Sequence, residues 1–223
     1  MKKNTNSIVL KEIETFHLEN FQELCNHLAS QDQDLKLILE NHGYPPMWTR
    51  ENTFKTLIHI ILEQQVSLAS ALAALNKLKE KLTEITPEKI LQLSDEEMRE
   101  CYVSRQKNIY IKGLANAIIN GEIDLEKLSK MSNDEVRKEL VNLKGIGNWT
   151  VDVYLMFTLQ RTDIFPIGDL AAVNALKHLK QLPPKSTKEE ILEISEKWKP
   201  FRSVASMMLW HYYLSAPKKP KNP

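Results

Sequence analysis

Apolar side chains recur at intervals of three and four residues along most of the chain, which is the spacing of one face of an α-helix. The recurring positions are Phe54, Leu57, Ile58, Ile61 and Leu62; Leu68, Leu72, Leu75 and Leu78; Ile109, Leu114, Ala117 and Ile118; Val136, Leu140 and Leu143; and Val204, Met208 and Leu209. Strand-type alternation is nearly absent, and the chain has only six glycines. The pattern therefore predicts an all-α protein.

Several helix boundaries are marked in the sequence. Ser94 with Glu97 and Ser132 with Glu135 have the spacing of capping boxes, and Thr86-Pro87 is a further helix start. Breaks in the pattern fall at Tyr44–Pro46, Gly121, Gly145–Gly147, Pro166–Gly168 and Pro183-Pro184. Because all of these breaks are short, we expect about nine or ten helices in one domain spanning 1–223, with a disordered tail over about 216–223.

Composition excludes several classes of protein. Two cysteines, Cys25 and Cys101, are too few for a disulfide framework, a four-thiolate zinc site or a four-cysteine iron–sulfur cluster, and the six histidines lack ligand spacing. We expect no required cofactor. The N-terminus MKKNTNSIVLKEIE has no apolar signal-peptide core, and no uncharged stretch approaches the length of a membrane span. A soluble, cytoplasmic protein is expected.

Charge is distributed unevenly along the chain. The net charge is +1, but residues 1–100 carry 11 basic and 16 acidic side chains, whereas residues 101–223 carry 19 and 13. A basic C-terminal half is compatible with a phosphate-bearing partner, although scattered surface charge also gives such splits by chance.

A glycine-spaced turn, Gly145-Ile146-Gly147, separates two expected helices at about 133–142 and 148–160. Two glycines allow the backbone to reverse tightly while Ile146 stays in the core. The amides of the second helix's first turn then point outward and form a site for an anion such as a backbone phosphate. An ordinary tight turn between helices is the alternative.

This turn and three other blocks resemble the HhH-GPD superfamily of DNA glycosylases, and within it the bacterial and yeast-type 3-methyladenine DNA glycosylase II. The blocks are ILEQQVSLASA (61–71), SRQKNIYIKGLANAIINGEIDL (104–125), the helix-hairpin-helix with the loop that follows it (143–170), and KWKPFRSVASMMLW (197–210). The resemblance implies two helical lobes, a helix-hairpin-helix at about 133–160 and a cleft between the lobes. The resemblance runs from about Pro46 to Tyr213, and we expect no counterpart of the bacterial type's β-rich N-terminal domain in the 45 or so residues before it, which read as helical.

The resemblance assigns the catalytic role to Asp169. Breaking an N-glycosidic bond dissociatively builds positive charge on the sugar, and a carboxylate near C1′ stabilises that charge. The position of Asp169 after Pro166-Ile167-Gly168 also suits a plain N-cap of a helix over Leu170–Leu179, and both roles are compatible. Asp152 and Asp163 are rival acids, of which Asp163 is interpreted as structural.

Trp149 stands where strand-cleaving relatives carry a lysine that forms a Schiff base with the sugar. No lysine occurs between Lys144 and Lys177, so we expect a monofunctional enzyme that leaves an abasic site. A tryptophan face also suits a cationic alkylated base, although ordinary core packing is the alternative. Further candidates for the pocket wall are Trp48, Tyr154, Trp210 and His211. The chain departs from the family's aromatic pattern at Val153 and His211.

The resemblance also implies DNA contacts. A wedge that fills the hole left by the extruded base is expected at Gln65, with Gln64 and Ser67 beside it; a polar step on one continuous helix over 54–80 is the alternative. The expected DNA-contacting residues are Gly145, Gly147, Lys144, Asn148, Thr150, Ser67, Arg105 and Lys107. A solvated helix face is the alternative for the charged residues among them. Arg202 is expected to form a structural ion pair near the cleft.

Relatives commonly hold Na⁺ or K⁺ at the hairpin through backbone carbonyls, which here are those of Val141, Leu143 and Gly145. The expected partner is double-stranded DNA with damaged bases, bound by a monomer in the nucleoid or the nucleus. The expected substrates are alkylated purines such as 3-methyladenine and 7-methylguanine. Two alternatives stay open: a glycosylase for uracil, hypoxanthine or ethenoadenine, and a non-catalytic module that binds damaged DNA.

Overall fold

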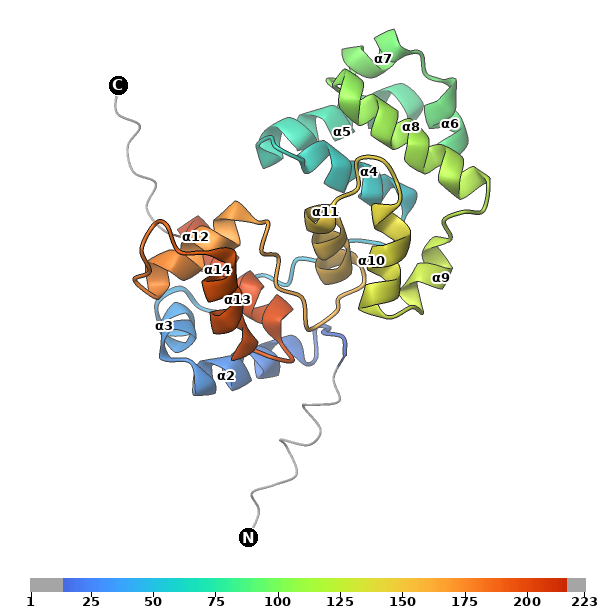
Figure 1. The fold of residues 1–223 in the computed structure, drawn as a ribbon. Helices are drawn as coiled ribbons and strands as arrows, with labels where there is room; N and C mark the ends of the chain where they lie inside the picture. Colours follow the sequence, from blue (N-terminus) through green and yellow to red (C-terminus); the bar gives the residue numbers. More distant parts are fainter. Residues whose placement is uncertain (1–13, 216–223) are drawn as a thin grey trace, which may run out of the picture. The chain divides into compact units, whose positions relative to one another are not determined.

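The structure, a computed structural model, describes residues 14–215 and confirms the all-α class (Figure 1). Within these residues it contains no β-strand, only an isolated antiparallel bridge between Thr15 and Arg161. The α-helices are α2 (Phe21–Gln31), α3 (Gln33–His42), α4 (Phe54–Glu63), α5 (Leu68–Leu82), α6 (Pro87–Gln92), α7 (Asp95–Glu100), α8 (Arg105–Ile119), α9 (Leu125–Ser129), α10 (Asn133–Val141), α11 (Asn148–Val153), α12 (Leu170–Leu179), α13 (Lys188–Glu196) and α14 (Arg202–Ser215). A π-helical turn, η1 (Tyr154–Thr158), continues α11.

The described residues thus contain more helices than the nine or ten expected. The helices α6 and α7 begin at the predicted starts Thr86-Pro87 and Ser94, whereas the five-residue helix α9 was not predicted. A helix of one or two turns is too short for the periodicity of apolar residues to distinguish it from a loop. The predicted capping boxes of Ser94 and Ser132 are both present. The predicted disordered tail, 216–223, lies outside the described residues.

The chain forms two compact units. Unit 1 combines the N-terminal part up to Thr49 with the part from Gln160 onward, and unit 2 is Arg50–Leu159. Among the described elements, unit 1 contains α2, α3 and α12 to α14, and unit 2 contains α4 to α11 with η1. Unit 2 is therefore inserted in the sequence between the two segments of unit 1.

In unit 1, α14 packs against α12, α3 and α2. Its core includes the fully buried Trp198, Phe201 and Phe16. A polar cluster ties the end of α12 to the start of α3. Lys180, the C-cap of α12, contacts both carboxylate oxygens of Asp32 at 2.7 and 2.8 Å and Oδ2 of Asp34 at 2.7 Å, while Trp198 Nε1 donates to Asp32 at 2.9 Å. This cluster holds α12 at the end opposite to Asp169.

In unit 2, α4 lies against α5, α8, α11 and η1. Its apolar residues, which include Leu57, Ile58 and Ile61, are fully buried because α4 is covered on several sides. At its C-terminal end the buried Glu63 accepts two hydrogen bonds from Arg50, at 2.9 and 2.8 Å. No helix among residues 14–215 is both long enough and apolar enough to cross a bilayer.

Candidate active site

Asp169 is the N-cap of α12, as the local sequence allows. The turn Pro166–Asp169 closes with a hydrogen bond from the Asp169 amide to the Pro166 carbonyl at 2.8 Å, which leaves Asp169 in an extended conformation. Its Oδ1 then accepts from the amide of Ala172 at 2.9 Å. The carboxylate therefore lies at the positive end of a ten-residue helix, where a negative charge is stabilised.

Two tryptophans of unit 1 accompany this carboxylate. Trp210 on α14 donates its indole N–H to Asp169 Oδ1 at 2.8 Å. The ring of Trp48 meets the ring of Trp210 edge to face, with centroids 6.5 Å apart and planes at 80°. All three side chains are partly exposed. Unit 1 thus presents an acid beside aromatic surface.

The remaining unit 1 candidates make other contacts. The His211 Nε2 lies 2.9 Å from the carbonyl oxygen of His42 at the end of α3. Arg202 donates to Asp163 Oδ1 at 2.6 Å and to Glu196 Oε1 at 2.9 Å. Asp163 and Arg202 therefore form an ion pair with each other, which leaves Asp169 as the acid that adjoins the tryptophans.

In unit 2, α10 and α11 form the hairpin around Gly145–Gly147. Gly145 has a φ of +89°, and a Cβ there would lie 2.1 Å from Cγ of Tyr110. Only glycine meets both conditions, since the left-handed conformation and the ring above it each exclude a side chain. Ile146 is buried, as predicted from its place between the glycines.

Gly147 differs from Gly145 in its surroundings. It is the N-cap of α11 with φ −100°, it makes no side-chain cap hydrogen bond, and nothing lies within 4 Å of a Cβ placed there. Its backbone therefore does not require glycine. The open space beside the first turn of α11 leaves room for a ligand's backbone to approach the helix amides.

Gln64 takes a place that the sequence did not predict. Its Nε2 donates to the carbonyl of Gly145 and to Oγ1 of Thr150, both at 2.9 Å. Gln64 is thus bonded to the hairpin in place of the exposed wedge position expected for it. Thr150 is 2% exposed, so its side chain lies inside unit 2, and its DNA contact stays a prediction.

The two helices of the hairpin are joined by an arginine. Arg137 on α10 donates to Oδ1 of Asn148 at 3.0 Å and to Oδ1 of the buried Asp152 at 2.6 Å. Burial raises the pKa of Asp152, and the hydrogen bond and charge of Arg137 oppose that rise. Asp152 is therefore a hairpin brace, and Asn148 remains exposed at the start of α11.

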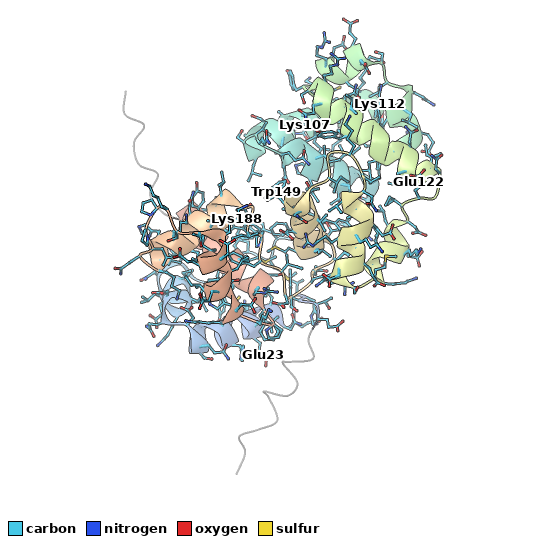
Figure 2. The ribbon with its side chains drawn as sticks, in the orientation of Figure 1. Glu23, Lys107, Lys112, Glu122, Trp149 and Lys188 are labelled. Carbon is cyan, nitrogen blue, oxygen red and sulfur yellow. The ribbon has the colours of Figure 1, made fainter. Side chains whose placement is uncertain are left out.

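Trp149 lies on the first turn of α11 and is partly exposed (Figure 2). Four residues later Val153 is buried, and Tyr154 is completely buried with its hydroxyl donating to Asn52 at 2.8 Å. Tyr154 is thus a core residue of unit 2 in place of the pocket wall expected for it. Trp149 is the aromatic residue of α11 that reaches the surface.

The expected wedge lies in the loop between α4 and α5. That loop interrupts the continuous helix over 54–80 considered as the alternative, because Ser67 caps α5 by accepting from the amide of Ser70 at 3.2 Å. Gln65 is exposed and has a φ of +57°. A left-handed glutamine is uncommon, and such conformations concentrate at functional positions.

The basic candidates of unit 2 divide into two kinds. Lys144 and Arg105 are exposed. Lys107, labelled in Figure 2, instead donates to the carbonyl of Leu62 at 2.7 Å, and burial lowers its pKa. Lys107 therefore caps the C-terminal end of α4 with one of its three N–H donors.

Three contributors to the hairpin were missed from the sequence: Tyr110 above Gly145, Arg137 between the helices, and Gln64 as a brace. Tyr110 and Gln64 lie in quoted blocks, but Tyr110 meets Gly145 from another helix and Gln64 bonds over 81 and 86 residues, so neither contact leaves a local pattern. The ion pair between Arg137 and Asp152 spans 15 residues, and a helical-wheel projection of the two hairpin helices could have predicted it.

In the described residues no group of three His, Cys, Asp or Glu side chains could hold a metal ion.

The geometry therefore comprises an acid with aromatic neighbours in unit 1, and a helix-hairpin-helix with an exposed tryptophan in unit 2. A family model, described as HhH-GPD superfamily base excision DNA repair protein, matches residues 58–201. The chain belongs to the HhH-GPD superfamily. This confirms the resemblance found in the sequence.

Individual superfamily members agree with this assignment. The chain is 35% identical over 191 residues to DNA-3-methyladenine glycosylase 1 of Schizosaccharomyces pombe, covering 82% of this chain and 84% of that one. It is 33% identical over 209 residues to DNA-3-methyladenine glycosylase of Bacillus subtilis, covering 88% and 69%. Among solved structures, the S. pombe 3-methyladenine DNA glycosylase in complex with abasic DNA matches with a TM-score of 0.77 at 33% identity, covering 87% of this chain and 98% of that one.

Proposed function

We propose that the protein is a monofunctional DNA glycosylase that removes alkylated purines, of the 3-methyladenine and 7-methylguanine type, and leaves an abasic site. The observation that carries the proposal is Asp169, held at a helix N-terminus and bonded to Trp210. The similarity to glycosylases named for 3-methyladenine supports the substrate class.

Asp169 supplies the negative charge in the proposed reaction. As the purine leaves, the sugar gains oxocarbenium character, and a fixed carboxylate stabilises it without reorganisation. The Ala172 amide and the Trp210 indole fix Oδ1, so the carboxylate cannot rotate freely. Asp169 also orients a water molecule that adds to C1′ and accepts one of its protons. The cationic base leaves with the bonding electron pair as a neutral purine, and the water's proton passes from Asp169 to solvent.

Trp149 contributes substrate preference in this proposal. An alkylated purine carries a positive charge, and the face of an indole attracts it more than it attracts a neutral purine. Because Trp149 replaces the lysine that lyases use and no lysine follows before Lys177, the chain has no Schiff-base nucleophile there. The proposal therefore excludes strand cleavage.

Double-stranded DNA is the proposed partner, bound by a monomer. The first-turn amides of α11 beside Gly147, with Lys144 and Arg105, are assigned to phosphates, and Gln65 is assigned to the space left by the extruded nucleotide. The solved complex of the S. pombe relative contains abasic DNA, which supports this choice of partner.

A monovalent cation at the hairpin is a further part of the proposal. Carbonyl oxygens are the donors that such ions take, and Val141, Leu143 and Gly145 would supply them. The Leu143 carbonyl accepts a hydrogen bond from the Ile146 amide, and the Gly145 carbonyl accepts one from the Gln64 side chain. Each carbonyl oxygen has a second lone pair for an ion. An ion held by these oxygens would reinforce the phosphate site electrostatically.

The test is base release from heavily methylated DNA and from duplexes that carry a single lesion, with products identified by mass. The proposal expects 3-methyladenine and 7-methylguanine to be released, with no covalent adduct trapped by borohydride. If only uracil, hypoxanthine or ethenoadenine is released, the proposed substrate class is wrong. If the protein binds the duplex but releases no base, it is a damage-binding module and not an enzyme.

A further inference from the structure

Gln64 connects two parts of unit 2 that the proposed function uses separately. It is the C-cap of α4 and begins the loop that contains Gln65. Its amide nitrogen donates at 2.9 Å to the Gly145 carbonyl and at 2.9 Å to Thr150 Oγ1. Both N–H groups of the Gln64 side-chain amide thus donate to the hairpin.

The two acceptors lie on either side of Trp149. Gly145 belongs to the turn and Thr150 to the first turn of α11, directly after Trp149. Gly145 is further confined by the ring of Tyr110, and Thr150 is buried. The amide of Gln64 therefore fixes the segment that carries Trp149 at two points, both of them inside unit 2.

The same residue also fixes the start of the wedge loop. Gln65 follows directly in a left-handed conformation, which is strained for a residue with a side chain and persists only where the surrounding structure holds it. Gln64 anchors the loop on one side, and Ser67 anchors it on the other by capping α5. With both ends held, Gln65 projects from a loop of defined shape.

From this arrangement we propose that Gln64 is a positioning residue that couples the wedge loop to the hairpin, so that Gln65 and Trp149 engage DNA as one rigid unit. The inference rests on the proposed function for the roles of Gln65 and Trp149. Its physical basis, the two hydrogen bonds of one amide, does not depend on that function.

A charge-changing substitution separates positioning from simple stability. In the Gln64→Glu protein, an ionised carboxylate would face the Gly145 carbonyl, so an acceptor opposes an acceptor and the hairpin is pushed away. Protonation of that carboxyl at low pH restores one donor and with it the coupling. In the Gln64→Leu protein no donor exists at any pH. The two proteins should therefore diverge as the pH falls.

The experiment measures single-turnover base release from a 7-methylguanine duplex between pH 5 and 8, corrected for spontaneous depurination. At pH 8 we expect both variants to be slower than the unaltered protein by about 10-fold, as for the loss of a part-buried hydrogen-bond donor. At pH 5 the Gln64→Glu protein should recover by several-fold relative to Gln64→Leu. Parallel pH profiles for the two variants would overturn the inference.

A second measurement needs no activity. Hydrogen exchange of the amides over 145–150 should accelerate in the Gln64→Leu protein more than exchange in α8 does. If the Gln64 variants fail to fold, Thr150→Val and Thr150→Ser take their place, since only serine keeps the acceptor for Gln64. If the unaltered protein releases no base, the proposed function is wrong. If hydrogen exchange over 145–150 is unchanged in Gln64→Leu, and if Thr150→Val and Thr150→Ser release base at equal rates, the coupling by Gln64 is wrong.

Discussion

The indole nitrogen of Trp210 donates a hydrogen bond to Oδ1 of Asp169, 2.8 Å away. The same oxygen accepts from the Ala172 amide at the start of α12. Hydrogen bonds to an ionised carboxylate are about twice as strong as those between neutral groups. The two donors therefore fix the orientation of the proposed catalytic carboxylate.

Replacing Trp210 with phenylalanine tests this relationship. Trp210→Phe keeps an aromatic ring beside Trp48 but removes the donor to Asp169. A hydrogen bond to a charged group contributes about 1.5–3 kcal/mol, so single-turnover base release should fall by about 10- to 100-fold. The measurement is the rate of 7-methylguanine release at saturating enzyme.

Trp198→Phe is the matched control, because Trp198 makes the same kind of bond to Asp32 in the same unit. That variant should lose thermal stability without a comparable fall in the single-turnover rate of the folded protein. Equal falls in both variants would mean that Trp210 acts only through the stability of unit 1.

Trp149 should determine the preference for charged bases. A cation–π contact contributes about 0.5–2 kcal/mol, so Trp149→Ala should reduce the release of 7-methylguanine relative to a neutral lesion by about 2- to 30-fold. The measurement is the ratio of 7-methylguanine to hypoxanthine release from otherwise identical duplexes. A ratio that stays constant while both rates fall would assign Trp149 to packing.

The two glycines of the hairpin should respond differently to alanine. Gly145→Ala combines a strained φ with a collision against Tyr110 and should cost on the order of 2–4 kcal/mol of unfolding free energy. Gly147→Ala meets no atom within 4 Å and should cost less than about 1 kcal/mol, while its methyl group narrows the approach to the α11 amides.

Denaturant unfolding and duplex binding, measured on both alanine variants, separate these effects. Gly147→Ala is expected to weaken DNA binding at nearly unchanged stability. Equal stability losses in the two variants would contradict the account of the turn.

The Lys180 cluster predicts acid sensitivity of unit 1. Burial alone would raise the pKa of Asp32, but hydrogen bonds from Lys180 and Trp198 and the charge of Lys180 hold it below its ordinary value. A folded-state pKa below that of the unfolded chain stabilises the protein above about pH 4, and that stabilisation is lost as the pH falls through the folded value.

Asp32→Asn keeps an N-cap for α3 but removes the charge, and should cost about 2 kcal/mol at pH 7. Thermal unfolding of both proteins at pH 7, 4 and 3 is the measurement, and the difference between them should narrow as the pH falls. A difference that is independent of pH would show that the Asp32 charge does not stabilise unit 1.

Local patterns in the sequence were sufficient for the longer helices and for the placement of Asp169. The capping boxes at Ser94 and Ser132 and the cap of α12 depend on neighbours three residues away, so their residue types reveal them. Thr187 with Glu190 forms a third capping box of the same spacing, which the sequence contained but which was not predicted.

Contacts between distant segments could not be read from such patterns. Gln64 and Lys107 both looked like exposed polar residues, yet each bonds to a carbonyl that its own helix does not supply. Tyr154 was predicted for the pocket wall, although it is completely buried in the core of unit 2. In each case packing between helices determined the side chain's role.

Base release by Asp169→Asn tests the central claim most directly. Asparagine is as good an N-cap as aspartate, so α12 and the stability of unit 1 should be preserved while the negative charge is lost. The account predicts that single-turnover release of 7-methylguanine falls by at least about 100-fold, whereas duplex binding and thermal stability stay close to those of the unaltered protein. Release at the unaltered rate by a folded Asp169→Asn protein would contradict it.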